Sequence, residues 1–334
     1  MMTPVKYILI LSQENIALAQ LEAAELLGLK AYEKKGHLII AHIKKNNHAK
    51  IPRLAYTHKV LKLVFECKSV ELIKRFESFD WSKIYRDDFC VRIHAEDKKN
   101  IAAHNLREQD LAPYVWRKLA EKSITPKVDL NNPATHIEVI IIGASAYVAL
   151  QFWENNEHFN DRRAHFRPEL HPTAMHPKMA RGLVNILNPS LQKGFIDPFC
   201  GAGGILLEAG LMRVPCTGYD IDAAMLRRCK INLDHYHIDP KQYTLRVEDA
   251  LAIKSYANVL TDLPYGKSSK KSDDITALYA RFIRKINGRA VIVMPDFVDY
   301  KKILKKNLSK KLAINALIPH YVHKSLTRMI VLIN

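Results

Sequence analysis

Cysteines are few in this sequence and are not spaced as metal ligands or disulfide partners usually are. The chain has 5 cysteines, an odd number without a Cys-x-x-Cys pair: Cys67, Cys90, Cys200, Cys216 and Cys229. A disulfide framework or a zinc site is therefore not expected, and no metal ligand is assigned. Because free thiols are typical of a reducing compartment, we expect a cytoplasmic protein.

Long apolar segments are missing as well. The longest apolar region, residues 137–153, is interrupted by Glu138, Gly143 and Ser145. The apolar run at residues 7–11 is too short for a signal peptide, and polar residues follow it directly. We therefore expect neither a membrane span nor a secretory signal.

Acidic residues are scarce relative to basic ones. Lysine and arginine number 51 against 34 aspartates and glutamates, which gives a net charge of +17 over 334 residues. This excess predicts a polyanionic partner, either nucleic acid or an anionic membrane surface. Hydrophobic residues make up 48% of the chain, an ordinary share for a globular protein, and the length fits two or three domains.

The order of expected elements divides the chain into three domains and a linker. Residues 1–67 predict the order β-α-β-β-α-β of a ferredoxin-like unit, and residues 68–153 a second α+β domain. Residues 154–176 are polar, histidine-rich and proline-bearing, which is typical of a linker. Residues 177–334 alternate strands with helices, which predicts a Rossmann-like sheet covered on both faces. The elements expected are strands at 5–11, 29–32, 38–43 and 60–67, a helix from Ser12 to Gly28, a helix at 48–56, and later strands at 195–197, 216–220, 244–247, 259–262 and 290–294.

A glycine-containing turn follows the first strand of the last domain. It reads Asp197-Pro-Phe199-Cys-Gly201-Ala-Gly203, and its glycines allow a tight turn and close approach of a ligand to the backbone. The pattern is not Gly-x-Gly-x-x-Gly, so it does not indicate a dinucleotide. An acidic residue before a short Gly-x-Gly suits a ligand that carries both an amine and a carboxylate. The alternative is a tight strand-to-helix turn without a ligand.

Further aspartates follow the next two strands. Asp220 lies about twenty residues on, where a carboxylate can bind both hydroxyls of a ribose. Asp249, followed by Ala250, ends the third strand, where its carboxylate could accept a hydrogen bond from an adenine amino group, and Ile221 follows Asp220. Asp222 is expected to cap the following helix instead. Each aspartate alone is typical of a surface turn, but together they indicate an adenosine-bearing ligand without a diphosphate, namely S-adenosylmethionine.

The fourth strand ends in Asp262-Leu263-Pro264-Tyr265. The carboxylate of Asp262 and a rigid backbone carbonyl beside it can accept hydrogens from a planar amine, while the Tyr265 ring stacks on the base. This would direct the nitrogen lone pair at a methyl donor. The alternative interpretation is a strand that ends at a proline, followed by a buried tyrosine.

Asp-Leu-Pro-Tyr resembles the D/N-P-P-Y motif of amino-directed methyltransferases. Residues 167–181 and 323–328 are similar to segments of the THUMP-containing tRNA guanine-N2 methyltransferases, especially archaeal enzymes that modify guanosine 10. Residues 128–133, with the apolar strand after them, resemble the late part of a THUMP domain. One departure is Leu263, which stands where the family usually has the first proline.

The resemblance implies a class I methyltransferase domain with a mixed seven-stranded sheet, preceded by ferredoxin-like and THUMP domains. It implies methyl transfer from S-adenosylmethionine to the N2 amine of a tRNA guanosine by a monomer, with Asp262, Pro264 and Tyr265 at the catalytic position. The THUMP domain would bind the tRNA acceptor end and so select the target by distance. Expected contacts to RNA are Arg167, His171, Lys267, Lys270 and Lys271.

Other functions are compatible with these residues. The target could be another tRNA or ribosomal guanine, or adenine in DNA, although the N-terminal half has no helix suited to reading a major groove. A non-catalytic RNA-binding protein that keeps a methyltransferase fold is the alternative from another class. For Ser325 and Arg328, near the C-terminus, the sequence indicates nothing beyond strand formation.

Overall fold

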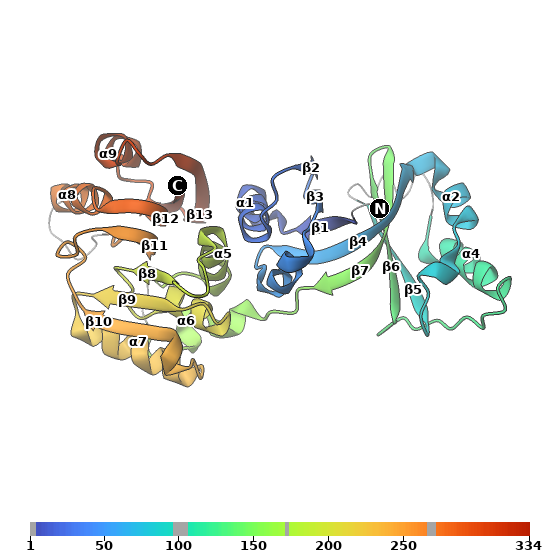
Figure 1. Cartoon of the computed structure of the whole chain (residues 1–334), viewed down its shortest axis with the longest axis horizontal. Helices are drawn as coiled ribbons and strands as arrows, with labels where there is room; N and C mark the ends of the chain where they lie inside the picture. Colours follow the sequence, from blue (N-terminus) through green and yellow to red (C-terminus); the bar gives the residue numbers. More distant parts are fainter. Residues whose placement is uncertain (1–4, 96–105, 171–173, 266–271) are drawn as a thin grey trace. The chain divides into compact units, whose positions relative to one another are not determined.

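The computed structural model describes residues 5–95, 106–170, 174–265 and 272–334, which form two compact units (Figure 1). Unit 1 comprises Met1–Gln13, Leu29–Pro52 and Thr57–Asn155. Unit 2 comprises Glu14–Gly28, Arg53–Tyr56 and Asn156–Asn334. The finer division into three domains and a linker stays a prediction from the sequence.

Unit 1 is built on a single sheet. Its strands are β1 (Lys6–Leu11), β2 (Tyr32–Lys35), β3 (Leu38–His42), β4 (Thr57–Lys68), β5 (Phe89–Ala95), β6 (Thr135–Ile142) and β7 (Ser145–Glu154), and its helices include α2 (Leu72–Ser78) and α4 (Glu108–Ala120). The strand order is β2-β3-β1-β4-β7-β6-β5. Because β4 pairs with β1 on one side and β7 on the other, the expected ferredoxin-like and THUMP regions share this sheet. Alternate residues of β6 (Ile137, Val139 and Ile141) face a core under α2 and α4.

Two expected elements of this unit are wrong in detail. The strand expected at residues 29–32 lies later, at Tyr32–Lys35. The helix expected at residues 48–56 is a 3₁₀ helix over Lys45–Arg53. Pro52 lies within it and has no backbone N–H, so an α-helix would be interrupted there.

Unit 2 contains a second sheet of seven strands. These are β8 (Phe195–Asp197), β9 (Cys216–Asp220), β10 (Tyr243–Val247), β11 (Tyr256–Asp262), β12 (Ile286–Pro295), β13 (Ile314–His323) and β14 (Leu326–Ile333). Its helices are α1 (Ile16–Leu27), α5 (Pro177–Leu187), α6 (Gly204–Leu211), α7 (Ala223–His235), α8 (Ser272–Ile283) and α9 (Tyr300–Asn307). The order is β10-β9-β8-β11-β12-β14-β13, and β14 runs antiparallel to both neighbours. Ala290, Ile292 and Met294 alternate along β12 and pack in the core with residues of α8 and α9. The expected mixed seven-stranded Rossmann-like sheet is confirmed.

Helix α1 lies early in the chain but packs in unit 2. It ends at Gly28 as expected, where a φ of 61° suits glycine. Its N-cap is Asn15 rather than the expected Ser12, and the Asn15 side chain accepts a hydrogen bond from Leu18 N at 3.1 Å. The helix therefore begins at Ile16, after a 3₁₀ turn over Gln13–Asn15, and not directly after Ser12.

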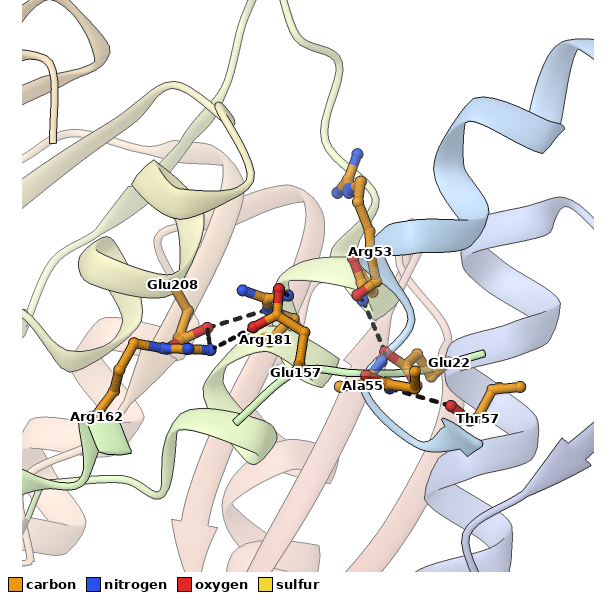
Figure 2. Close-up of polar contacts among 10 residues, drawn as sticks. Glu22, Arg53, Ala55, Thr57, Glu157, Arg162, Arg181 and Glu208 are labelled. Carbon is orange, nitrogen blue, oxygen red and sulfur yellow. Dashed lines mark hydrogen bonds and ion pairs between the residues drawn. The ribbon is translucent and has the colours of Figure 1, made fainter. Parts of the chain in front are cut away.

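A buried carboxylate fixes α1 against α5 (Figure 2). Glu22 is fully buried and accepts hydrogen bonds from Ala55 N, Tyr56 N and Asn185 Nδ2, each at 2.7 Å. Gly182 on α5 makes this close packing possible, since a Cβ there would lie 2.7 Å from the Tyr56 ring. The first helix of the sequence is therefore part of the fold of unit 2.

A second polar cluster ties residues 156–170 to α5 and α6 (Figure 2). Glu208 on α6 is fully buried and accepts hydrogen bonds from Arg162 Nε at 2.8 Å and Arg181 Nε at 3.0 Å. Glu157 pairs with both arginines, at 3.0 Å and 2.8 Å. Two arginines and two glutamates balance one another in charge, which is what a buried ionic cluster requires.

Candidate active site

The parallel strands of unit 2 end at one edge of the sheet, and the predicted site residues lie there. In the pairing register, Asp197 is opposite Gly218, and Asp220 is opposite Val247. β8 and β11 are neighbours in the sheet although β9 and β10 lie between them in the sequence, so the strand order reverses between β8 and β11. Ligands of open α/β sheets bind at such a reversal, beyond the carboxyl ends of the strands.

The glycine turn after β8 has the geometry that its sequence predicts. Gly203 has a φ of +83°, and a Cβ at this position would lie 2.4 Å from Cys229 Sγ, so only glycine fits. Gly201 has a φ of +52°, with no atom within 4 Å of where its Cβ would lie. The Gly201 N–H donates to Asp220 Oδ2 at 3.0 Å, while Asp222 N donates to Oδ1 at 2.9 Å. Both oxygens of this carboxylate are thus held beside the turn.

Asp197 is the deepest carboxylate of the site. Its side chain is 1% exposed and accepts hydrogen bonds from Thr261 Oγ1 at 2.6 Å and Phe199 N at 3.2 Å. Its pKa is raised to about 7. Burial is the largest cause, and the negative charges of Asp262 and Asp220 contribute to the same rise. A buried carboxyl group close to two further carboxylates forms a site suited to a cation.

Asp262, at the end of β11, is enclosed by two side chains. The Tyr265 hydroxyl donates to Asp262 Oδ1, and Arg328 Nη2 lies 3.2 Å from Asp262 Oδ2. Arg328 Nε also donates to the Tyr265 oxygen at 2.8 Å. Burial raises the pKa of Asp262, while Arg328 and the Tyr265 hydrogen bond oppose that rise. The carbonyl of Pro264 accepts a hydrogen bond from the Tyr279 hydroxyl at 2.7 Å, which fixes the backbone of the motif.

The residues expected around an adenine lie at the ends of β9 and β10. Glu248 N donates to Asp220 O at 3.1 Å, which joins the two strand ends. Ile221 is an apolar side chain with 74% of its surface exposed, whereas Ala250 is buried. The exposed Asp249 accepts a hydrogen bond from Leu251 N at 2.8 Å, so it also stabilises its own turn.

Comparison with known proteins identifies the family. Residues 69–151 match the THUMP domain and residues 164–327 match the RMKL-like methyltransferase domain. The chain is 31% identical over 287 residues to the tRNA (guanine(10)-N2)-dimethyltransferase of Methanothermobacter thermautotrophicus, covering 83% of this chain and 82% of that one. The chain belongs to the tRNA (guanine(10)-N2)-dimethyltransferase family. Membership confirms the expected family and enzyme class, a methyltransferase that uses S-adenosylmethionine.

A second relative and a solved structure are also similar to this chain. The enzyme of the same name from Methanocaldococcus jannaschii is 28% identical over 309 residues, covering 84% of this chain and 85% of that one. The crystal structure of SMU.472 complexed with SAH has a TM-score of 0.53 at 14% identity, covering 99% of this chain and 98% of that chain. At that identity the likeness concerns the fold alone.

The surroundings of the Arg167 side chain show whether S-adenosylmethionine fits this site. It is 5% exposed, and its Nε donates to Arg162 O at 2.9 Å. Its Nη2 is buried and has no hydrogen-bond partner among the described residues. Its Nη1 lies 3.2 Å from where a Cβ of Gly204 would be, at the first residue of α6. A guanidinium with one unpartnered nitrogen near a helix N-terminus suits an anion, and the carboxylate of S-adenosylmethionine is one.

Sequence reasoning did not assign Arg328, although it lies in the recognised segment at residues 323–328. Its contact with Asp262 depends on β14 lying antiparallel next to β12, which no local pattern reveals. Asp222, in contrast, caps α7 as expected, accepting from Ala224 N at 2.7 Å. The remaining expected RNA contacts, His171, Lys267, Lys270 and Lys271, lie outside the described residues.

Two classes of feature are not found in the part of the chain that the structure describes. No group of three or more histidines, cysteines, aspartates and glutamates there could hold a metal ion. No described helix has the length and apolarity to cross a membrane.

Proposed function

We propose that this protein transfers methyl groups from S-adenosylmethionine to the N2 amine of guanosine 10 in tRNA. The observation that carries the proposal is that Asp262 and Tyr265 lie at the same sheet edge as the glycine turn and Asp197. We further propose that the enzyme acts as a monomer in the cytoplasm and that the THUMP region binds the tRNA acceptor end.

The cofactor would be held by groups from three strand ends. Asp220, fixed by two backbone N–H groups, would bind the ribose hydroxyls, and the exposed Ile221 would pack against the adenine beside Asp249 and Ala250. Asp197 would face the cationic amine. The bound cofactor supplies a methyl group that is already electrophilic.

Arg167 would bind the cofactor carboxylate together with the backbone of Gly201 and Gly203. We favour this role over the RNA contact expected from the sequence. A side chain that is 5% exposed cannot reach a tRNA phosphate without rearrangement, whereas its unpartnered nitrogen already lies at the start of α6.

The motif after β11 would orient the target amine. The lone pair of guanine N2 is delocalised into the ring, so it must be aimed and its developing positive charge offset. Asp262 would accept an N2 hydrogen and supply that negative charge, and Tyr265 would stack on a base extruded from the RNA helix. The Pro264 backbone, held by Tyr279, keeps both groups in line. In the net reaction N2 gains a methyl group and loses one proton for each transfer.

An unmodified tRNA transcript and labelled S-adenosylmethionine test this function. After the reaction, nuclease digestion locates the label, and a transcript with adenosine at position 10 serves as the control. We expect labelled N2-methylguanosine at position 10 and no label in the control transcript. Label at another guanosine would refute the target, and tRNA binding without any transfer would favour the non-catalytic alternative.

A further inference from the structure

The last strand of the sheet carries a buried cation into the active site. Arg328 is 6% exposed and lies on β14, where it pairs in register with Pro295 of β12 and His320 of β13. Because β14 runs opposite to the parallel strands, its first residues lie where those strands end. The reversal of this one strand thus brings Arg328 to the tip of β11.

Arg328 makes one direct and one indirect contact with the Asp262 carboxylate. Nη2 lies 3.2 Å from Oδ2, and Nε donates at 2.8 Å to the Tyr265 oxygen, whose hydroxyl donates to Oδ1. The guanidinium carbon also lies 5.7 Å from the centroid of the Tyr265 ring. The planar guanidinium of arginine presents several N–H donors in a fixed geometry, so it can bind a carboxylate and a phenol oxygen at once. The ammonium group of a lysine lacks this fixed geometry.

Among the described residues, the other titratable groups near Asp262 do not stabilise its negative charge in this way. Asp197 on β8 is a second carboxylate, and its charge and that of Asp262 oppose each other. Tyr279 on α8 is a neutral phenol whose pKa is raised by burial and, to a smaller extent, by the charge of Asp262. Burial of Asp262 favours its protonated form, and Arg328 is the cation that opposes this effect.

We propose that Arg328 is a positioning residue for methyl transfer, which keeps the Asp262 carboxylate ionised and, through Tyr265, fixes the direction in which it accepts. The proposal rests on the proposed role of Asp262. The contacts of Arg328 described above are with Asp262 and Tyr265, both assigned to the target base, so its loss should slow transfer without weakening cofactor binding.

The test compares Arg328→Met, Arg328→Lys and wild type under single-turnover conditions with saturating tRNA and cofactor. We expect Arg328→Met to lower the rate by about 10²–10³-fold, the cost typical of one lost electrostatic contact in a transition state. The acid limb of its pH–rate profile should move to higher pH, because without Arg328 the Asp262 carboxyl stays protonated up to a higher pH. Arg328→Lys should restore the position of the acid limb but only part of the rate.

Arg289→Met is the matched control. Arg289 is an arginine of the same sheet, paired with Glu25 at 2.6 Å and bonded to the carbonyls of Leu187 and Ile186, far along β12 from the motif. The Arg289→Met variant should lose thermal stability, but the acid limb of its pH–rate profile should stay where it is in wild type. An unchanged rate in Arg328→Met, or a slower rate with an unmoved acid limb, would overturn the proposal.

A titration without cofactor or tRNA separates this inference from the function itself. The side-chain carboxyl signal of Asp262, labelled with ¹³C and assigned by its loss in Asp262→Asn, should titrate at higher pH in Arg328→Met than in wild type. If wild type methylates no tRNA, the proposed function fails, yet this titration still tests the contact. Equal titration in both proteins would contradict the role given to Arg328.

Discussion

Cofactor affinity should depend on pH through Asp197. In the free protein, burial and the neighbouring carboxylates hold its pKa at about 7, so the carboxyl keeps its proton in mildly acidic solution. The cationic amine of the cofactor favours the ionised form, so binding should release a proton and strengthen as pH rises towards 7. The cofactor amine, with a pKa near 7.7–8.0 for an α-amino group, stays charged over this range.

The size of the effect follows from the pKa. If only the ionised form binds, the apparent Kd increases by the factor 1 + 10^(pKa − pH), which is about twofold at pH 7, about elevenfold at pH 6 and about a hundredfold at pH 5. Calorimetry in two buffers of different ionisation enthalpy measures both Kd and proton release. About 0.9 proton should be released per cofactor at pH 6.

Two variants separate Asp197 from other titrating groups. Asp197→Asn should bind weakly, and its Kd should vary far less between pH 5 and 7. Asp222→Asn, at the cap of α7, should keep the wild-type pH dependence, since asparagine also caps helices well. A wild-type Kd that stays constant over this range, or an equal slope in Asp197→Asn, would refute the reasoning.

Three further substitutions have outcomes that the structure specifies. Glu22→Ala leaves three buried donors unpaired, each at about 1–3 kcal/mol, so the free energy of unfolding in urea should fall by several kcal/mol; a fall below ~1 kcal/mol would contradict the buried bonds. Glu208→Gln removes one of the two carboxylates that neutralise the buried Arg181 and the part-buried Arg162, and should cost up to about 3–5 kcal/mol by the same measurement, whereas no loss of stability would mean that the cluster is not formed. Gly203→Ala would place a Cβ 2.4 Å from Cys229 Sγ, so calorimetry should find cofactor binding greatly weakened, and wild-type affinity would show that the turn is not part of the site.

The sequence predicted most of the catalytic half because its signals there are local. A buried parallel strand reads as a short apolar run, and the turns after β8 and β11 carry glycine, aspartate and proline at fixed positions. The edge where Asp197, Asp220 and Asp262 meet follows from strand order alone.

Features that depend on distant contacts could not be predicted in this way. The partner of α1 is α5, which lies more than a hundred residues later, and nothing near Glu22 reveals its bonds to Asn185. Arg328 is similar, because its role appears only when β14 is placed beside β12. The 3₁₀ helix over Lys45–Arg53 differs from the expected α-helix for a local reason, because Pro52 lies inside the segment and has no backbone N–H to continue an α-helix.

The central claim is that the carboxylate at the tip of β11 acts on the target amine and not on the cofactor. Single-turnover transfer to tRNA by Asp262→Ala, with its affinity for S-adenosylmethionine measured in parallel, tests it most directly. The account predicts a rate about 10²–10³-fold below wild type and a cofactor Kd close to the wild-type value. A near wild-type rate, or a loss of rate explained entirely by weaker cofactor binding, would contradict it.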